Sequence, residues 1–157
     1  MLTDFLYIFY WWLLLLFVGI LSVPLLKNIF NRFWDKGWIF GKTISLVVLS
    51  YLTFILGRVR ILPFSRLTIF ILIVLSLVAN WLWKKNNQEE FKDFWKDNWQ
   101  SFLIEEILFF VLLAFWSIIR SFQPSVEGLE KFMDLGFVNS ILKTKWFPAD
   151  DMWFAGE

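Results

Sequence analysis

The chain has 157 residues, of which 59% are hydrophobic and 22% aromatic, and its formal net charge is +1. A soluble domain of this size carries about 45–50% apolar residues, so part of the apolar surface must face lipid, and the near-neutral charge gives no indication of a nucleic-acid partner. The sequence contains no Cys and no His, which excludes disulfides, thiolate chemistry and imidazole-based catalysis within it. Acid–base or metal chemistry must therefore use carboxylates.

Four apolar runs are each long enough to cross about 30 Å of hydrocarbon as a helix. They cover residues 5–26, 38–56, 67–83 and 102–119. Pro24 is expected to kink or end the first helix, and Lys42 is expected to extend its side chain from the second toward the lipid headgroups. The sequence therefore predicts an all-α, polytopic membrane protein with about four transmembrane helices within residues 1–120.

An amphipathic stretch at residues 90–101 precedes the fourth run. Its aromatic side chains recur every three or four positions and continue into that run: Phe91, Phe94, Trp95, Trp99 and Phe102. Lysines and aspartates occupy the other side. This pattern predicts a helix that lies in the membrane interface, and docking on another protein is the alternative.

The distribution of Lys and Arg among the connections predicts the orientation. The first and third connections carry eight basic residues and the second carries three: Lys27, Arg32, Lys36, Lys42, Lys84, Lys85, Lys92 and Lys96 against Arg58, Arg60 and Arg66. Basic loops remain on the cytoplasmic side. We therefore expect a multi-pass protein of the cell membrane whose N-terminus and residues 121–157 are extracytoplasmic.

Residues 121–157 differ from the rest, because they are richer in Gly, Pro and acidic residues and contain no run that could span a bilayer. Ser125 is a suitable N-cap, and a short helix is expected to continue to about Lys143. We expect the segment to begin a large extracytoplasmic loop that is truncated at Glu157, so that the chain is an N-terminal fragment.

Two acidic pairs in this segment could carry chemistry. Glu130 and Asp134 are spaced i, i+4, which places both carboxylates on one helix face, where one could act as a general base; alternatively they favour the helix N-terminus or pair with Lys131. Asp150 and Asp151 could hold Mg²⁺ or Mn²⁺, which prefer carboxylate oxygens, or could simply be solvated.

Three charged residues flank the fourth span. Glu105 and Glu106 lie near its start, where an interfacial position would avoid the cost of burying a carboxylate. Arg120 lies at its other end, where it could either extend toward water or hold a lipid phosphate.

The second half of the sequence resembles a known family over about 50 residues. The matching features, from Glu105 to Glu157, are Phe109-Phe110, Trp116, Arg120, Pro124, Glu130-Lys131-Phe132-Met133-Asp134, Asn139, Phe147-Pro148, Asp150 or Asp151, Trp153 and Ala155-Gly156. They resemble the uncharacterised bacterial and archaeal "YYY" membrane proteins, distant relatives of the GT-C glycosyltransferases. The family has Pro where this chain has Phe132, and the Tyr triplet that gives the family its name is absent here.

The resemblance implies a function for the chain. It would be the N-terminal part of a GT-C-like membrane glycosyltransferase that takes its sugar from a lipid-phosphate-linked donor. Glu130 or Asp134 would be the catalytic base, and Arg120, Asp150 and Asp151 would bind substrate. Its partners would be membrane lipids, a polyprenyl-phosphate sugar and further helices of the same protein, without which the fragment would be inactive. The alternative is a non-enzymatic membrane module, such as an assembly partner or part of a transporter.

Overall fold

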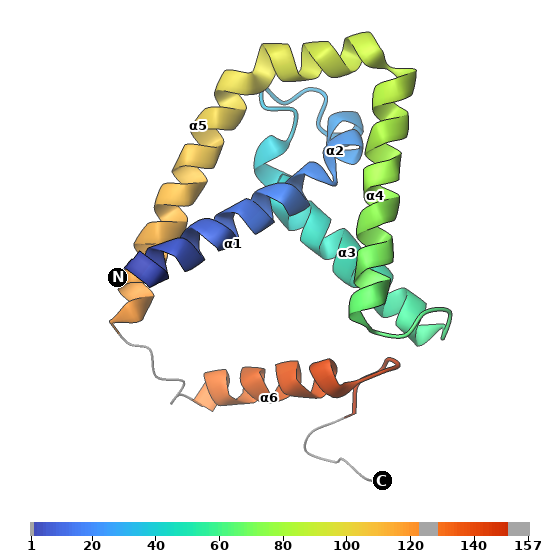
Figure 1. The fold of residues 1–157 in the computed structure, drawn as a ribbon, viewed down its shortest axis with the longest axis vertical. Helices are drawn as coiled ribbons and strands as arrows, with labels where there is room; N and C mark the ends of the chain where they lie inside the picture. The colour runs from blue at the N-terminus through green and yellow to red at the C-terminus, as the bar shows by residue number, and fades with distance from the viewer. Residues whose placement is uncertain (1, 123–128, 151–157) are drawn as a thin grey trace.

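The computed structural model describes residues 2–122 and 129–150, and its regular elements there are all helical (Figure 1). They are α1 (Leu2–Ile20), α2 (Val23–Ile29), a 3₁₀ turn η1 (Trp38–Phe40), α3 (Gly41–Arg58), α4 (Arg66–Asn86), α5 (Gln88–Ser121) and α6 (Leu129–Lys143). Four helical segments are long and apolar enough to cross a membrane: Thr3–Ile20, Trp38–Arg58, Arg66–Asn86 and Gln88–Ser121. The predicted all-α class with four spans is confirmed.

The first apolar run forms two helices rather than one. α1 ends at Ile20, and α2 begins at Val23 with Pro24 in its first turn, where a missing backbone N–H costs nothing. The hydroxyl of Ser22 donates to the carbonyl oxygens of Gly19 and Gly41 at 3.0 and 3.2 Å. The break is therefore tied to α3 and does not depend on proline alone.

Small residues bring α1 and α3 together where they cross. A Cβ atom placed on Gly19 would lie 3.2 Å from Cγ of Lys42, and one on Gly41 would lie 3.3 Å from the carbonyl oxygen of Gly19. Small residues at such positions allow close approach of membrane helices. This crossing brings the first turn of α3, including Lys42, against α1.

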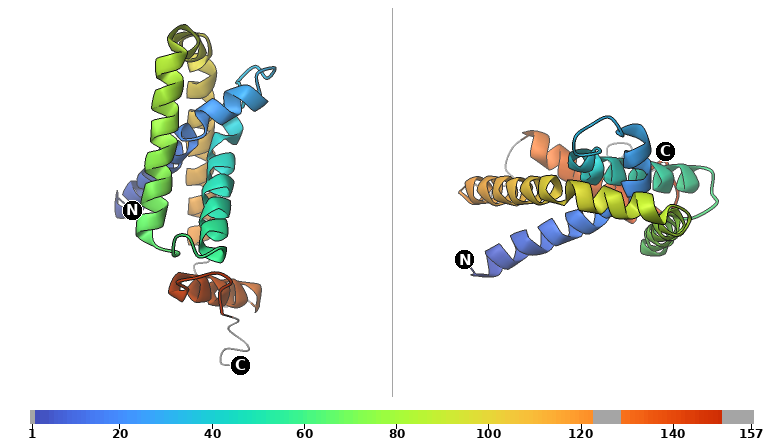
Figure 2. Two further views of the ribbon diagram at one scale, coloured as in Figure 1. Left: turned by 90° about the vertical axis from the view of Figure 1, so that its right-hand side faces the viewer. Right: turned by 90° about the horizontal axis from the view of Figure 1, so that it is seen from above.

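The predicted interfacial helix and the fourth span form one continuous helix, α5. Its 34 residues correspond to about 51 Å at 1.5 Å per residue, more than one crossing requires. Figures 1 and 2 show its first part running across the end of the bundle before it turns to run alongside the other spans. Phe94 and Phe102 of the aromatic stripe are buried against Val23 and Trp38. The stripe therefore covers the chain's own helix ends, and Trp99, 54% exposed, is the member that faces outward.

The last described helix, α6, lies across the opposite ends of the spans (Figures 1 and 2). The N–H of Phe64, in the α3–α4 connection, donates to the carbonyl oxygen of Lys145 at 2.8 Å. The ring of Phe147 lies 5.2 Å from the rings of both Phe54 and Phe64 and packs on Gly57, where a Cβ would come within 2.8 Å of it. The C-terminal end of α6 is thereby fixed to the connection between α3 and α4.

Candidate functional site

The carboxylate of Glu106, in α5, is the point where three other elements meet. The indole N–H of Trp12 in α1 donates to Oε2 at 3.2 Å, and that of Trp38 in η1 donates to Oε1 at 2.8 Å. The ammonium group of Lys42 in α3 forms an ion pair with Oε1. Glu106 and Lys42 are 7% and 8% exposed. Each donor satisfies part of the charge that burial would otherwise leave uncompensated.

Lys42 therefore does not extend toward the lipid headgroups as we expected from the sequence. Its Nζ atom points into the bundle, pairs with Glu106 and lies 4.6 Å from the ring centroid of Phe109, which adds a cation–π contact. The carboxylate of Glu106 pairs with the ammonium group inside the bundle, so Lys42 does not need to reach the headgroups to find a partner. We name Trp12, Trp38, Lys42 and Glu106 the buried ionic cluster.

The loop before η1 holds Trp38 in place for this cluster. The carboxylate of Asp35, which is 2% exposed, accepts hydrogen bonds from the N–H groups of Gly37 and Ile39, both at 3.2 Å. Gly37 has φ of +80°, in the left-handed region that a side chain disfavours, and a Cβ there would lie 2.7 Å from Phe30. The indole of Trp38 then stacks on Phe102 of α5 with ring centroids 4.5 Å apart.

Glu105, next to the cluster, is equally buried but differently placed. Both of its carboxylate oxygens are buried, and neither has a hydrogen-bond partner among the described residues. A buried polar group without a partner is rare in folded proteins, and ionisable groups inside membrane proteins commonly mark functional positions. Glu105 and Glu106 thus occupy distinct environments, although the sequence suggested one interfacial position for both.

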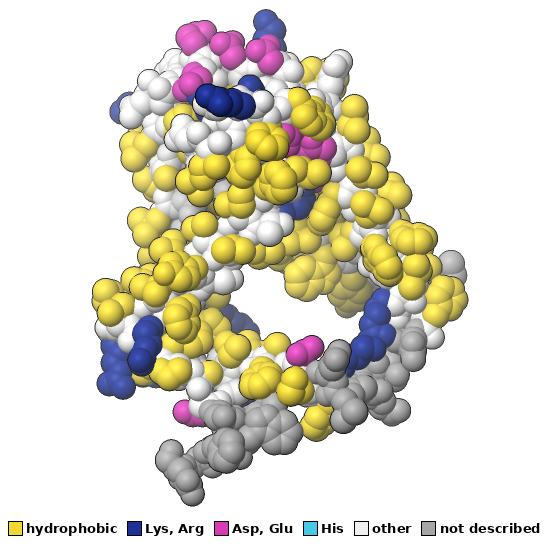
Figure 3. All heavy atoms as spheres, turned by 180° about the vertical axis from the view of Figure 1, so that it is seen from behind, with side chains coloured by type: hydrophobic (Ala, Val, Ile, Leu, Met, Phe, Trp, Pro, Cys, Tyr) yellow, Lys and Arg dark blue, Asp and Glu magenta, His cyan; other side chains and the backbone are white. Residues whose placement is uncertain are grey.

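An apolar cavity of about 710 Å³ lies between the spanning helices and the C-terminal end of α6. Residues from four helices and from the segment after α6 line it, and it is open on one side; the lining includes Phe17, Leu49, Thr53, Ile73, Ile141 and Phe147. The hydroxyl of Thr53 donates to the carbonyl oxygen of Leu49 within its own helix, so it adds little polarity. Figure 3 shows an opening through the molecule between the bundle and α6, with hydrophobic side chains over much of its rim and a few charged ones at its edge.

The predicted acidic pair lies on α6. Asp134 is exposed there, and no ion pair joins it to Lys131 within the described part of the chain. Glu130 belongs to the same helix, one turn earlier, but its side chain lies outside what the structure describes. Their roles stay predictions.

The remaining predicted substrate ligands do not converge in the described residues. Asp150 follows α6, and its backbone carbonyl accepts a hydrogen bond from the hydroxyl of Ser140. Asp151 lies outside the described residues, as does the expected N-cap Ser125. Arg120, in the last turn of α5, lines a shallow hollow with Trp116 and Ser117. Within residues 2–122 and 129–150, no three acidic side chains come together as a metal site would require.

Sequence reasoning did not identify the buried ionic cluster. Its members come from four elements, and Lys42 and Glu106 are 64 positions apart in the chain. The sequence did show Lys42 inside one apolar run and Glu105-Glu106 inside another. An ion pair between the two runs would have lowered the free-energy cost of placing these charges in the membrane.

These features define a polytopic helical membrane protein with a buried ion pair and an apolar cavity between its spans. The chain belongs to the family described as "Uncharacterized membrane protein (DUF2298)", whose family model matches residues 48–157. This agrees with the part of the sequence resemblance that pointed to an uncharacterised membrane family. Comparisons with curated proteins and with solved structures found no match.

Proposed function

We propose that this chain is part of a GT-C-like membrane glycosyltransferase that uses a lipid-phosphate-linked sugar. The apolar cavity between the spans and α6 is the observation that carries the proposal. A polyprenyl donor needs an apolar channel for its hydrocarbon chain, and that channel must open where the sugar meets its acceptor. At about 710 Å³, the cavity is within the range of small-molecule sites.

The position of α6 supports the same function. This helix carries Glu130 and Asp134, and its C-terminal end closes one wall of the cavity through Ile141. The contact of Phe147 with Gly57 holds that end against α3. A carboxylate on α6 would therefore be presented at the membrane surface beside the bound lipid, where it could take the proton from an acceptor hydroxyl. Arg120 would bind the donor phosphate.

Filling the cavity should weaken binding of a polyprenyl probe. The probe is a benzophenone-bearing polyprenyl phosphate, and the sample is the complete protein that contains this chain, in nanodiscs. Leu49→Trp should lower its photolabelling about tenfold, which is the loss expected when two methylene groups can no longer be buried. Val47→Trp is the matched control, because Val47 belongs to the same helix but is 61% exposed and does not line the cavity.

The two variants distinguish a cavity site from general membrane partition. Equal labelling of both variants and the parent would remove the support that the cavity gives. Labelling confined to the cavity, together with transfer of sugar from polyprenyl-phosphate [¹⁴C]mannose, would support the enzyme. Specific labelling with no transfer from any lipid-linked sugar would favour the non-enzymatic membrane module.

The proposed reaction also requires α6 on the extracytoplasmic side. A Cys at Asn139, which is exposed on α6, should react with a membrane-impermeant maleimide added to intact cells, and a Cys at Asn86 should react only after permeabilisation. The gel shift of the labelled protein measures the reaction of each Cys variant. The reverse pattern would place α6 in the cytoplasm and contradict the orientation.

A further inference from the structure

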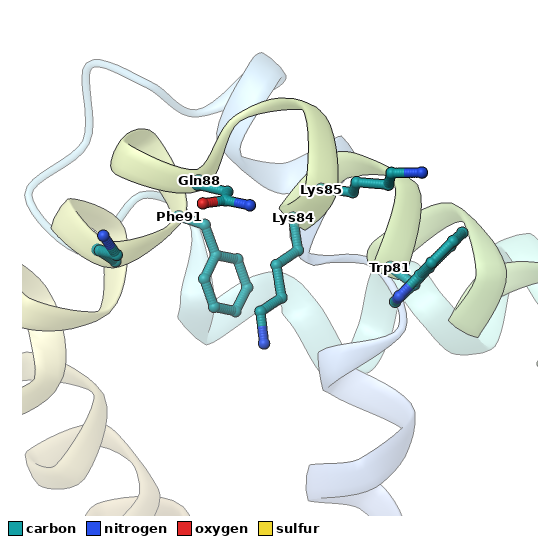
Figure 4. Close-up of a pocket in the computed structure, with 6 residues that line it drawn as sticks. Trp81, Lys84, Lys85, Gln88 and Phe91 are labelled. Atoms are coloured by element: carbon teal, nitrogen blue, oxygen red, sulfur yellow. The ribbon is translucent and has the colours of Figure 1, made fainter.

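The corner between α4 and α5 has the features of a second binding site. A hollow of about 530 Å³ lies there, at the end of the molecule opposite α6. It is lined by Trp81, Lys84, Lys85, Gln88, Phe91 and Lys92, and Figure 4 shows these side chains on the last turns of α4 and the first turns of α5. Basic and aromatic groups thus surround one space at the end of a spanning helix.

The charge of this hollow favours an anion. Neither Lys84 nor Lys85 forms an ion pair with a carboxylate in the described ranges. The acids at the start of α5 are already paired, because Glu89 binds Lys92 at 2.8 Å and Glu90 binds Lys27 of α2. A further acid, Asp93, lines the neighbouring hollow and not this one.

Lys27 shows how this corner is held together. Burial, and then the like charge of Lys36, lower its pKa from the ordinary value. Its ammonium group nevertheless pairs with Glu90 and lies 5.4 Å from the ring centroid of Trp83, so it joins α2 to both α4 and α5. The contacts of Lys27 therefore hold together the helix ends that line the hollow.

Aromatic rings limit the freedom of the two unpaired lysines. Nζ of Lys84 lies 5.2 Å from the ring centroid of Phe91, and Nζ of Lys85 lies 5.3 Å from that of Trp81. Figure 4 shows Lys84 extended beside Phe91. Such contacts restrict the ammonium groups before a ligand arrives, and this lowers the conformational entropy lost on binding.

An apolar stripe leads away from the hollow along α4. Trp81, which lines the hollow, is followed on the same face by Leu77, Val74 and Phe70, all exposed. A free phosphate would make no contact with this apolar stripe, whereas the acyl chains of a phospholipid would pack along it. We propose that the α4–α5 corner binds an anionic phospholipid, with its phosphate in the hollow that Lys84 and Lys85 line and its chains along α4.

The full-length chain in detergent provides the test, with retained lipids counted by native mass spectrometry. Phosphatidylglycerol should bind more tightly than phosphatidylcholine with the same acyl chains. The double variant Lys84→Gln, Lys85→Gln should lose about tenfold in affinity for phosphatidylglycerol, since each basic residue near an anionic headgroup adds to the attraction. The charge-conserving variant Lys84→Arg, Lys85→Arg should keep it.

A second lysine pair controls for charge alone. Lys143→Gln, Lys145→Gln removes two exposed lysines near the end of α6 and should leave phosphatidylglycerol binding unchanged. An equal loss in this variant, equal binding of the two lipids, or displacement of phosphatidylglycerol by excess inorganic phosphate would each overturn the proposal. If the Gln variant does not fold, the comparison of the two lipids on the parent chain still decides.

Discussion

Replacing Lys42 with Met should lower the free energy of unfolding by about 3–5 kcal/mol. The change leaves the carboxylate of Glu106 buried with two neutral indole donors and no positive charge, and breaking a buried ion pair from one side carries a cost of this size. Detergent-solubilised protein, unfolded by heat or by increasing SDS and followed by circular dichroism, would measure the change.

Glu106, the other member of the ion pair, provides the control for this prediction. Lys42→Met combined with Glu106→Gln removes both charges and keeps an acceptor for the two indole N–H groups, so its stability should return most of the way to that of the parent. Lys145→Met, at an exposed position, should change stability by less than about 0.5 kcal/mol. A Lys42→Met protein as stable as the parent would show that Glu106 does not depend on Lys42.

Replacing Asp134 with Asn should lower sugar transfer by roughly 10²–10⁴-fold, if Asp134 is the catalytic base, because an amide cannot accept the proton of the acceptor hydroxyl. Asn keeps the size of the side chain, and Asp134 is exposed on α6, so stability should hardly change. Initial rates of transfer from polyprenyl-phosphate [¹⁴C]mannose by the full-length protein in nanodiscs would measure the effect.

Glu130→Gln, one turn earlier on α6, resolves which carboxylate acts. A loss confined to Glu130→Gln would move the catalytic role to that residue. Asp97→Asn, an exposed acid at the opposite end of the bundle, is the matched control and should transfer sugar normally. Normal transfer by both α6 variants would contradict the assignment of either acid as the base.

The spanning helices could be predicted because the signal for each of them, a long apolar run, lies within the helix itself. α4, predicted over residues 67–83, covers Arg66–Asn86 in the structure, and α6 ends at Lys143 as expected. Helix breaks were harder to place, because the end of α1 depends on hydrogen bonds from Ser22 to another helix as well as on Pro24.

The buried ionic cluster could not be predicted in the same way. Hydropathy shows that Lys42 and Glu106 are costly in lipid, but it does not show which groups face them across the bundle. The aromatic stripe of α5 illustrates the same limit. Its spacing indicated an apolar face, yet only the structure shows that Phe94 and Phe102 pack on Val23 and Trp38. The partner of an amphipathic face depends on the tertiary fold.

The shared carboxylate of Glu106 has a consequence for how the protein is made. Chains emerge from the ribosome with their N-terminal segments first, so Trp12, Trp38 and Lys42 are synthesised before Glu106. Until α5 is inserted, Lys42 lacks its partner, and its flexible stem can keep the ammonium group at the membrane surface. Once α5 is inserted, Glu106 can pair with Lys42 and accept hydrogen bonds from Trp12 and Trp38, which joins α1, η1 and α3. We therefore expect α1 and α3 to reach their final packing only after α5, the fourth candidate span among the described residues, is in the membrane.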